Sequence, residues 1–153
     1  MEPLKDEEQV IWMIDDDPIQ HFCIGKSLRI QGLSKPVRSF FNGGEALAYF
    51  ITHLNDFSLL PNIILLDLNM PYVNAWQFLQ QYAQIKHRFQ KVITIYVISS
   101  TLNTTEINKV TSIPEVSGFF SKPVRPDVLK YILTASKFRL RTFPIPLNED
   151  AEG

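Results

Sequence analysis

Short apolar runs alternate with longer segments of helical periodicity along most of this chain, and this alternation limits the possible folds more than any other feature. Five runs rich in Val, Ile and Phe are expected to be strands, at residues 10–14, 37–41, 63–66, 92–98 and 118–120. Because a helical segment follows each run, successive strands need crossover connections and lie parallel. The sequence therefore predicts an α/β fold, a doubly wound five-stranded parallel sheet with helices on both faces.

Helix start and stop signals occupy the segments between these runs. The third helix is indicated by Trp76, Leu79 and Tyr82, which recur at helical spacing. The other signals are Pro18 and Gly32 at the ends of the first helix, Asn42 before the second, Thr104 or Thr105 before the fourth with Pro114 after it, and Pro126 at the start of the fifth.

The composition is that of a globular protein with no strong preference for polyanions. With 153 residues, 45% of them apolar and 20% charged, the chain suits one domain with a substantial core. The formal charge of −1 provides no field toward nucleic acid or anionic membranes, so neither is expected as a partner. No apolar stretch approaches a membrane span. Cys23 is the single cysteine, which excludes an internal disulfide and favours a cytoplasmic location.

One domain with unanchored ends is the expected organisation. Residues 1–8 are interpreted as an N-terminal arm, 9–137 as the domain and 138–153 as a C-terminal tail that contains Pro144 and Pro146. The segment 138–143 could instead form a short strand or an interaction segment. Because the chain ends soon after the fifth helix, we expect no DNA-binding or catalytic output domain.

Polar residues follow four of the five expected strands, where ligands of such sheets bind. They are Asp15, Asp16 and Asp17 after the first strand, Asp67 and Asn69 after the third, Ser99 and Ser100 after the fourth, and Lys122 with Pro123 after the fifth.

Each of these features has an ordinary explanation when it is taken alone. Acidic residues often precede a helix N-terminus, and a Lys before a Pro is usually a surface residue before a turn. Their joint arrival at one edge of the sheet is not explained in that way. Carboxylates that lie close together stay ionised only beside a cation, because like charges raise one another's pKa. Mg²⁺ would suit such a cluster, since it prefers oxygen ligands and keeps positions open for water or a phosphoryl group.

From about residue 10 to 136 the chain resembles a response-regulator receiver domain, the CheY-like family of two-component signalling. Four elements carry the resemblance in the order and spacing of that family: Ile-Asp-Asp-Asp-Pro at 14–18, Leu-Leu-Asp-Leu-Asn-Met-Pro at 65–71, Ile-Ser-Ser at 98–100 and Gly-Phe-Phe-Ser-Lys-Pro at 118–123. Any one element would be a weak signal, whereas four in register make a strong one. The resemblance implies the flavodoxin-like form of the predicted sheet.

The resemblance also implies roles for the acidic residues and a Mg²⁺ cofactor. Asp67 would be the phosphoacceptor and a metal ligand. Asp15 and Asp16 would be the acidic pair that supports Mg²⁺, and Asn69 would contribute its backbone carbonyl. Asp17 lies one place past the usual pair, so it is interpreted as a loop residue or a helix cap.

The remaining roles implied by the family concern the phosphoryl group and the response to it. Ser99 would bond a phosphoryl oxygen, and Lys122 would pair with the phosphoryl charge; its peptide bond to Pro123 is expected to be cis. Ser99 and Phe119 would form a switch, in which the aromatic ring moves as the hydroxyl shifts. The fourth helix, last strand and fifth helix would then bind a downstream protein or a second copy of the chain.

The expected function is that of a stand-alone receiver that takes a phosphoryl group from a histidine kinase or histidine phosphotransfer protein. Such a protein catalyses only its own phosphorylation and dephosphorylation. Two alternatives stay open. One is a receiver-like adaptor that is never phosphorylated, in which the unusual Tyr-Val-Asn-Ala at 72–75 alters the loop beside the site. The other is a phosphatase of the haloacid dehalogenase type, which usually has a second Asp where this chain has Asn69.

Overall fold

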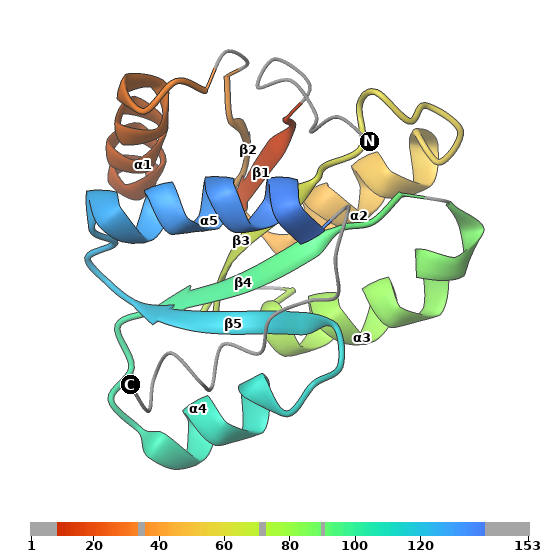
Figure 1. Ribbon diagram of the computed structural model, residues 1–153. Helices are drawn as coiled ribbons and strands as arrows, with labels where there is room; N and C mark the ends of the chain where they lie inside the picture. The colour runs from red at the N-terminus through yellow and green to blue at the C-terminus, as the bar shows by residue number, and fades with distance from the viewer. Residues whose placement is uncertain (1–8, 34–35, 71–72, 90, 140–153) are drawn as a thin grey trace.

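The computed structural model describes residues 9–33, 36–70, 73–89 and 91–139 (Figure 1). The predicted N-terminal arm, Tyr72 of the unusual loop, and residues 140–153 of the predicted tail lie outside the described residues. Five parallel strands form one sheet in the order β2-β1-β3-β4-β5, which confirms the predicted fold class. They are β1 (Ile11–Ile14), β2 (Arg38–Phe40), β3 (Ile63–Asp67), β4 (Thr94–Ser99) and β5 (Val116–Ser121).

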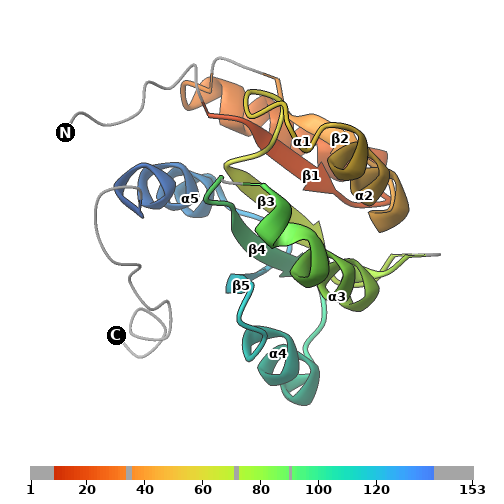
Figure 2. The same ribbon diagram turned by 90° about the vertical axis from the view of Figure 1, so that its right-hand side faces the viewer.

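Helices cover both faces of this sheet. Figure 2 shows α5 on one side of the sheet and α2 and α3 on the other. Within the described residues, no helix combines the length and apolar character that crossing a bilayer requires. The helices are α1 (Pro18–Ile30), α2 (Gly43–Thr52), α3 (Ala75–Ile85) with the short 3₁₀ helix η2 (Lys86–Arg88), α4 (Thr104–Thr111) and α5 (Pro126–Arg139). The boundary predicted at residue 137 therefore falls inside α5.

The core consists of two layers, one on each face of the sheet. Alternate residues of the central strands face opposite ways, so Ile64 and Leu66 pack among α2 and α3 while Ile63 and Leu65 pack among α1 and α5. All five residues of β3 are buried, including its last, Asp67. The aliphatic residues therefore anchor a strand that ends in a carboxylate.

Helix caps agree with the sequence at three of the predicted positions. Asp17 caps α1 by accepting a hydrogen bond from the Ile19 amide at 2.9 Å, and Asn42 caps α2 in the same way from Glu45 at 2.9 Å. Gly32, just past α1, has a positive φ of 104° that favours glycine.

The strand ends differ from the predicted ranges by one or two residues, and two of the differences in boundary, at α4 and at β4, have a clear physical reason. The cap of α4 is Asn103, which accepts from the Glu106 amide at 3.1 Å, rather than Thr104 or Thr105, and α4 ends at Thr111, ahead of Pro114. An amide side chain competes well with a threonine hydroxyl for this position. Strand β4 starts at Thr94 rather than at Val92, which is 60% exposed and outside the sheet.

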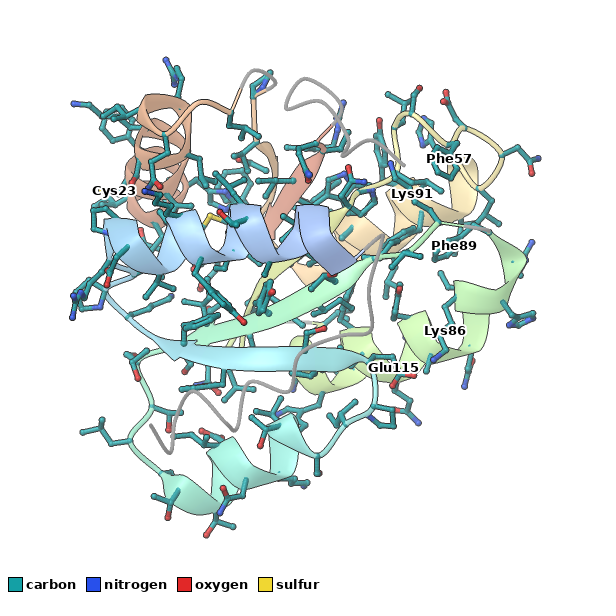
Figure 3. The ribbon with its side chains drawn as sticks, in the orientation of Figure 1. Cys23, Phe57, Lys86, Phe89, Lys91 and Glu115 are labelled. Atoms are coloured by element: carbon teal, nitrogen blue, oxygen red, sulfur yellow. The ribbon has the colours of Figure 1, made fainter. Side chains whose placement is uncertain are left out.

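Two lysines fix the end of the sheet at which the strands begin. Lys86 forms an ion pair with Glu115, which links η2 to the start of β5 (Figure 3). Lys91 donates hydrogen bonds to the carbonyls of Phe57 and Leu60 and lies 4.7 Å from the centre of the Phe57 ring. The contacts of Lys91 hold the long loop before β3 against the segment that leads into β4. Both lysines lie at the end of the sheet away from the predicted site.

Candidate functional site

Three of the predicted acidic residues lie together at the carboxyl ends of β1 and β3. These strands pair in parallel with Ile14 opposite Leu66, so the residues that follow them leave the sheet side by side. Each of Asp15, Asp16 and Asp67 offers one carboxylate oxygen, and these oxygens all lie within 4.8 Å of one another. Asp15 and Asp67 are 1% and 6% exposed, whereas Asp16 faces solvent.

Lys122 brings a positive charge to this cluster from the loop after β5. Its Nζ lies 2.9 Å from Asp15 Oδ2 and 3.2 Å from Asp67 Oδ1. Its backbone amide donates to the Ser99 carbonyl at 3.0 Å, and its peptide bond to Pro123 is cis, as predicted. Burial lowers the pKa of the Lys122 ammonium, but the hydrogen bond to Asp15 and the charge of Asp67 outweigh burial and raise it above its usual value. The ammonium therefore stays charged.

The Asp67 carboxyl is held in an environment that disfavours its charge. Burial, and then the negative charge of Asp15, raise its pKa from 3.8 to about 6; Lys122 opposes this shift and Asp16 adds to it. One ammonium thus does not neutralise the cluster. A second cation would relieve the remaining repulsion among the three carboxylates.

The donor set of the cluster fits Mg²⁺. All three groups are hard carboxylate oxygens, which this ion prefers, and their spacing lets them reach one ion. The exposure of Asp16 leaves a solvent side where Mg²⁺ can keep waters. Asn69 lies exposed in the loop after β3, two positions past Asp67, and its role as a carbonyl ligand stays a prediction.

Ser99 and Phe119 occupy the same face of the sheet beside the cluster. Ser99 is the last residue of β4, 1% exposed, and its Oγ accepts a hydrogen bond from the Thr101 amide at 3.1 Å. Phe119 pairs with Val97, two residues before Ser99, and packs half-buried in the core layer of α2 and α3. The hydroxyl and the ring are therefore neighbours along one face, with the ring in partial contact with solvent.

A frame of hydrogen bonds around Asp15 was not foreseen from the sequence. The Asp15 amide donates to the Phe40 carbonyl at 3.0 Å, and its Oδ1 accepts from the Asp17 amide at 2.8 Å. Its own carbonyl lies 2.7 Å from Nε2 of His21, a buried residue of α1. No motif points to His21; a polar residue on the inner face of the helix that follows the acidic loop is its only signal.

Comparison with known proteins agrees with this geometry. A family model described as the response regulator receiver domain matches residues 11–134. No curated relative matches the chain at a significant level.

Solved structures of similar fold include a two-component response regulator from Cytophaga hutchinsonii, at 23% identity and a TM-score of 0.72, covering 85% of this chain and 97% of that one. A response regulator receiver protein from Dyadobacter fermentans has 24% identity and a TM-score of 0.67, with 84% and 97% covered. Vibrio cholerae chemotaxis protein CheY4 has 20% identity and a TM-score of 0.64, with 82% and 96% covered. At these identities the neighbours establish the fold alone.

Proposed function

This chain belongs to the response regulator receiver domain family, and on that premise we propose that Asp67 accepts a phosphoryl group from a histidine kinase or a histidine phosphotransfer protein in a Mg²⁺-dependent reaction. Receiver domains of this family are signalling modules of two-component systems rather than enzymes that turn over outside substrates. The observation that carries the proposal is a buried carboxylate at a strand end, 3.2 Å from a lysine ammonium and within 4.8 Å of two more carboxylates.

In the proposed reaction an Asp67 carboxylate oxygen attacks phosphorus while the bond from phosphorus to the donor histidine nitrogen breaks. The product is an acyl phosphate on Asp67, and the freed imidazole nitrogen takes a proton from solvent. A strand end holds the attacking oxygen in a fixed position, which favours in-line transfer. The Lys122 ammonium, already near Asp67, donates to a phosphoryl oxygen and offsets its charge. The Ser99 hydroxyl donates a hydrogen bond to a second phosphoryl oxygen.

Asp15, Asp16 and Asp67, with the backbone carbonyl of Asn69, would hold Mg²⁺. When bound, the ion supplies positive charge for the phosphoryl oxygens, which is the main requirement of such transfers. The contribution of the chain itself is to hold three carboxylates close together, and the Lys122 ammonium offsets part of the repulsion among them.

The downstream output is proposed to be a protein contact. Hydrogen bonding of Ser99 to the phosphoryl group would shift the hydroxyl from its present bond with Thr101, and the half-buried Phe119 ring would turn toward the space it leaves. The remodelled surface comprises α4, β5 and the start of α5, where a downstream protein or a second copy would bind. Hydrolysis of the acyl phosphate by the chain itself would end the signal.

The proposed location is the cytoplasm, because a single cysteine suits a reducing compartment.

The proposal is tested by the intact mass of the protein after incubation with acetyl phosphate, with Mg²⁺ or with EDTA. We expect a phosphoryl increment with Mg²⁺ and none with EDTA. An increment missing under both conditions would favour the non-phosphorylated adaptor. Steady release of phosphate from p-nitrophenyl phosphate would favour a phosphatase of the haloacid dehalogenase type.

Removing the Lys122 ammonium should separate metal binding from phosphoryl transfer. In Lys122→Ala we expect Mg²⁺ affinity to change little while the rate of phosphoryl incorporation falls by about 10²-fold, the usual cost of losing one preorganised charge partner. Lys130→Ala, which removes an exposed lysine of α5, is the matched control. Normal labelling of Lys122→Ala would contradict the role given to this residue.

Beryllofluoride, which mimics a phosphoryl group on a carboxylate, should reveal the switch. We expect backbone amide shifts to spread from the loops around Asp67 to residues 104–125, because the Ser99 hydroxyl and the Phe119 ring change position together. The measurement is a pair of ¹H–¹⁵N spectra with and without beryllofluoride and Mg²⁺. Shifts confined to the loops beside Asp67 would show that no such coupling exists.

A further inference from the structure

His21 joins helix α1 to the backbone of the acidic loop. The residue is 9% exposed, its Nε2 lies 2.7 Å from the Asp15 carbonyl oxygen, and its ring packs against Phe41 with 4.6 Å between the ring centres. A carbonyl oxygen can only accept, so Nε2 carries the hydrogen of this bond. The other nitrogen, Nδ1, is buried and has no hydrogen-bond partner within residues 9–33, 36–70, 73–89 and 91–139. Among the residues that the structure describes, the one polar contact of this imidazole is therefore with Asp15.

The bond fixes the peptide unit between the two acidic residues of the loop. The Asp15 carbonyl belongs to the planar group that leads to the Asp16 nitrogen, so holding its oxygen sets the orientation of both residues. Further hydrogen bonds restrain Asp15. Its amide donates to the Phe40 carbonyl, and its carboxylate accepts from the Asp17 amide and the Lys122 ammonium. The exposed Asp16 carboxylate takes part in no hydrogen bond or ion pair within the described part of the chain. Its position therefore depends on the backbone that His21 holds.

We propose that His21 is a positioning residue for the metal-binding acid pair: by donating from Nε2 to the Asp15 carbonyl, it orients the peptide that places Asp16 beside Asp15 and Asp67. The inference rests on the proposed function, because it assigns His21 an effect on Mg²⁺ affinity. Without the donor, a buried carbonyl loses its partner and the peptide turns toward water. Asp16 then leaves the position from which it reaches the ion.

Two substitutions separate the hydrogen bond from the bulk of the ring. His21→Gln keeps an N–H donor at about the reach of Nε2, whereas His21→Leu keeps the volume and removes the donor. We expect His21→Leu to raise the Mg²⁺ dissociation constant by about tenfold or more, the usual effect of losing a partner that orients a metal ligand, and His21→Gln to stay within about threefold of the unsubstituted chain. The measurement is a Mg²⁺ titration followed by ¹H–¹⁵N spectra.

Phe41→Leu is the matched control, because it removes the ring contact of His21 and leaves the donor in place. If Phe41→Leu and His21→Leu weaken Mg²⁺ binding equally, the effect is due to packing and the proposal is overturned. An unchanged Mg²⁺ dissociation constant in His21→Leu would also overturn it. If His21→Leu does not fold, His21→Asn replaces it. The shorter amide of Asn does not reach the Asp15 carbonyl, so this substitution should weaken Mg²⁺ binding as Leu does.

Spectra of the metal-free protein provide a readout that is independent of the proposed function. The imidazole ¹⁵N shifts should show hydrogen on Nε2, and the Asp16 and Asp17 amides should shift in His21→Leu but much less in His21→Gln. If the unsubstituted chain binds no Mg²⁺, the proposed function fails, while these amide shifts still decide whether His21 orients the loop. Amides that stay in place in His21→Leu would overturn the positioning role.

Discussion

Asp67→Asn should lower phosphoryl incorporation from acetyl phosphate by at least about 10²-fold, because the amide lacks the nucleophilic oxygen and Asp67 alone among the three carboxylates of the cluster is itself part of a strand, as the last residue of β3. The measurement is the intact mass of the protein over time at saturating Mg²⁺. Asp56→Asn, which changes an exposed carboxylate in the loop before β3, is the matched control and should be labelled normally. Undiminished labelling of Asp67→Asn would exclude this residue as the acceptor.

The same substitution should stabilise the protein when Mg²⁺ is absent. The pKa of Asp67 is raised to about 6 from 3.8 in the folded chain, so the folded state binds the proton more tightly than the unfolded state. Ionised Asp67 therefore costs stability above pH 6, and the cost disappears as the pH falls below the ordinary value. Asn, which is neutral, should raise the free energy of unfolding by about 1–3 kcal/mol at pH 8.

Urea unfolding of the two proteins at pH 8 and at pH 5, in EDTA, measures this effect. The increase in the free energy of unfolding caused by Asp67→Asn should be largest at pH 8. It should be smaller at pH 5, where much of Asp67 is protonated in the folded state of the unsubstituted chain. Asp56→Asn is again the control and should show neither change. A substitution that destabilises the chain at both pH values would contradict the electrostatic description of the site.

Asp16→Asn should have the second largest effect, a loss of Mg²⁺ affinity of about 10–100-fold, because the ion loses a charged oxygen ligand that faces its solvent side. Phosphoryl incorporation at low Mg²⁺ should fall in parallel and recover in part when Mg²⁺ is raised. The measurements are a Mg²⁺ titration and labelling rates at several Mg²⁺ concentrations. Asp127→Asn, at an exposed carboxylate of α5, is the control. Matching titrations of Asp16→Asn and the unsubstituted chain would reject Asp16 as a ligand.

The fold and the convergence of the acidic residues could be predicted from the sequence because both depend on short-range patterns. The apolar run before Asp67 marks a buried strand, and the alternation of strands with helices implies that strands are parallel. Parallel strands end at one edge, so Asp15, Asp16 and Asp67 had to meet there once β1 and β3 were neighbours. The family motifs added the roles expected of these residues.

The contacts that refine the site could not be predicted in this way. The sequence does predict that Lys122 meets the acidic residues at this edge, and the ion pairs confirm it. Its choice of Asp15 as a partner depends on loop geometry rather than on strand pairing, because β3 and β4 separate β5 from β1 in the sheet. The bond from His21 to the Asp15 carbonyl joins a side chain to a backbone group, and no residue pattern records such a pairing. The prediction that β4 starts at Val92 was wrong because an apolar residue can lie exposed just outside a sheet, as Val92 does.

Locating the phosphoryl group within the chain tests the central claim most directly. After incubation with acetyl phosphate and Mg²⁺, borohydride reduces an acyl phosphate to an alcohol and so converts phosphorylated Asp to homoserine, which peptide mass spectrometry can place. We predict homoserine at position 67, only in the sample that contained Mg²⁺. Homoserine at another position, or none in a protein that gained phosphoryl mass, would contradict the assignment of Asp67 as the acceptor.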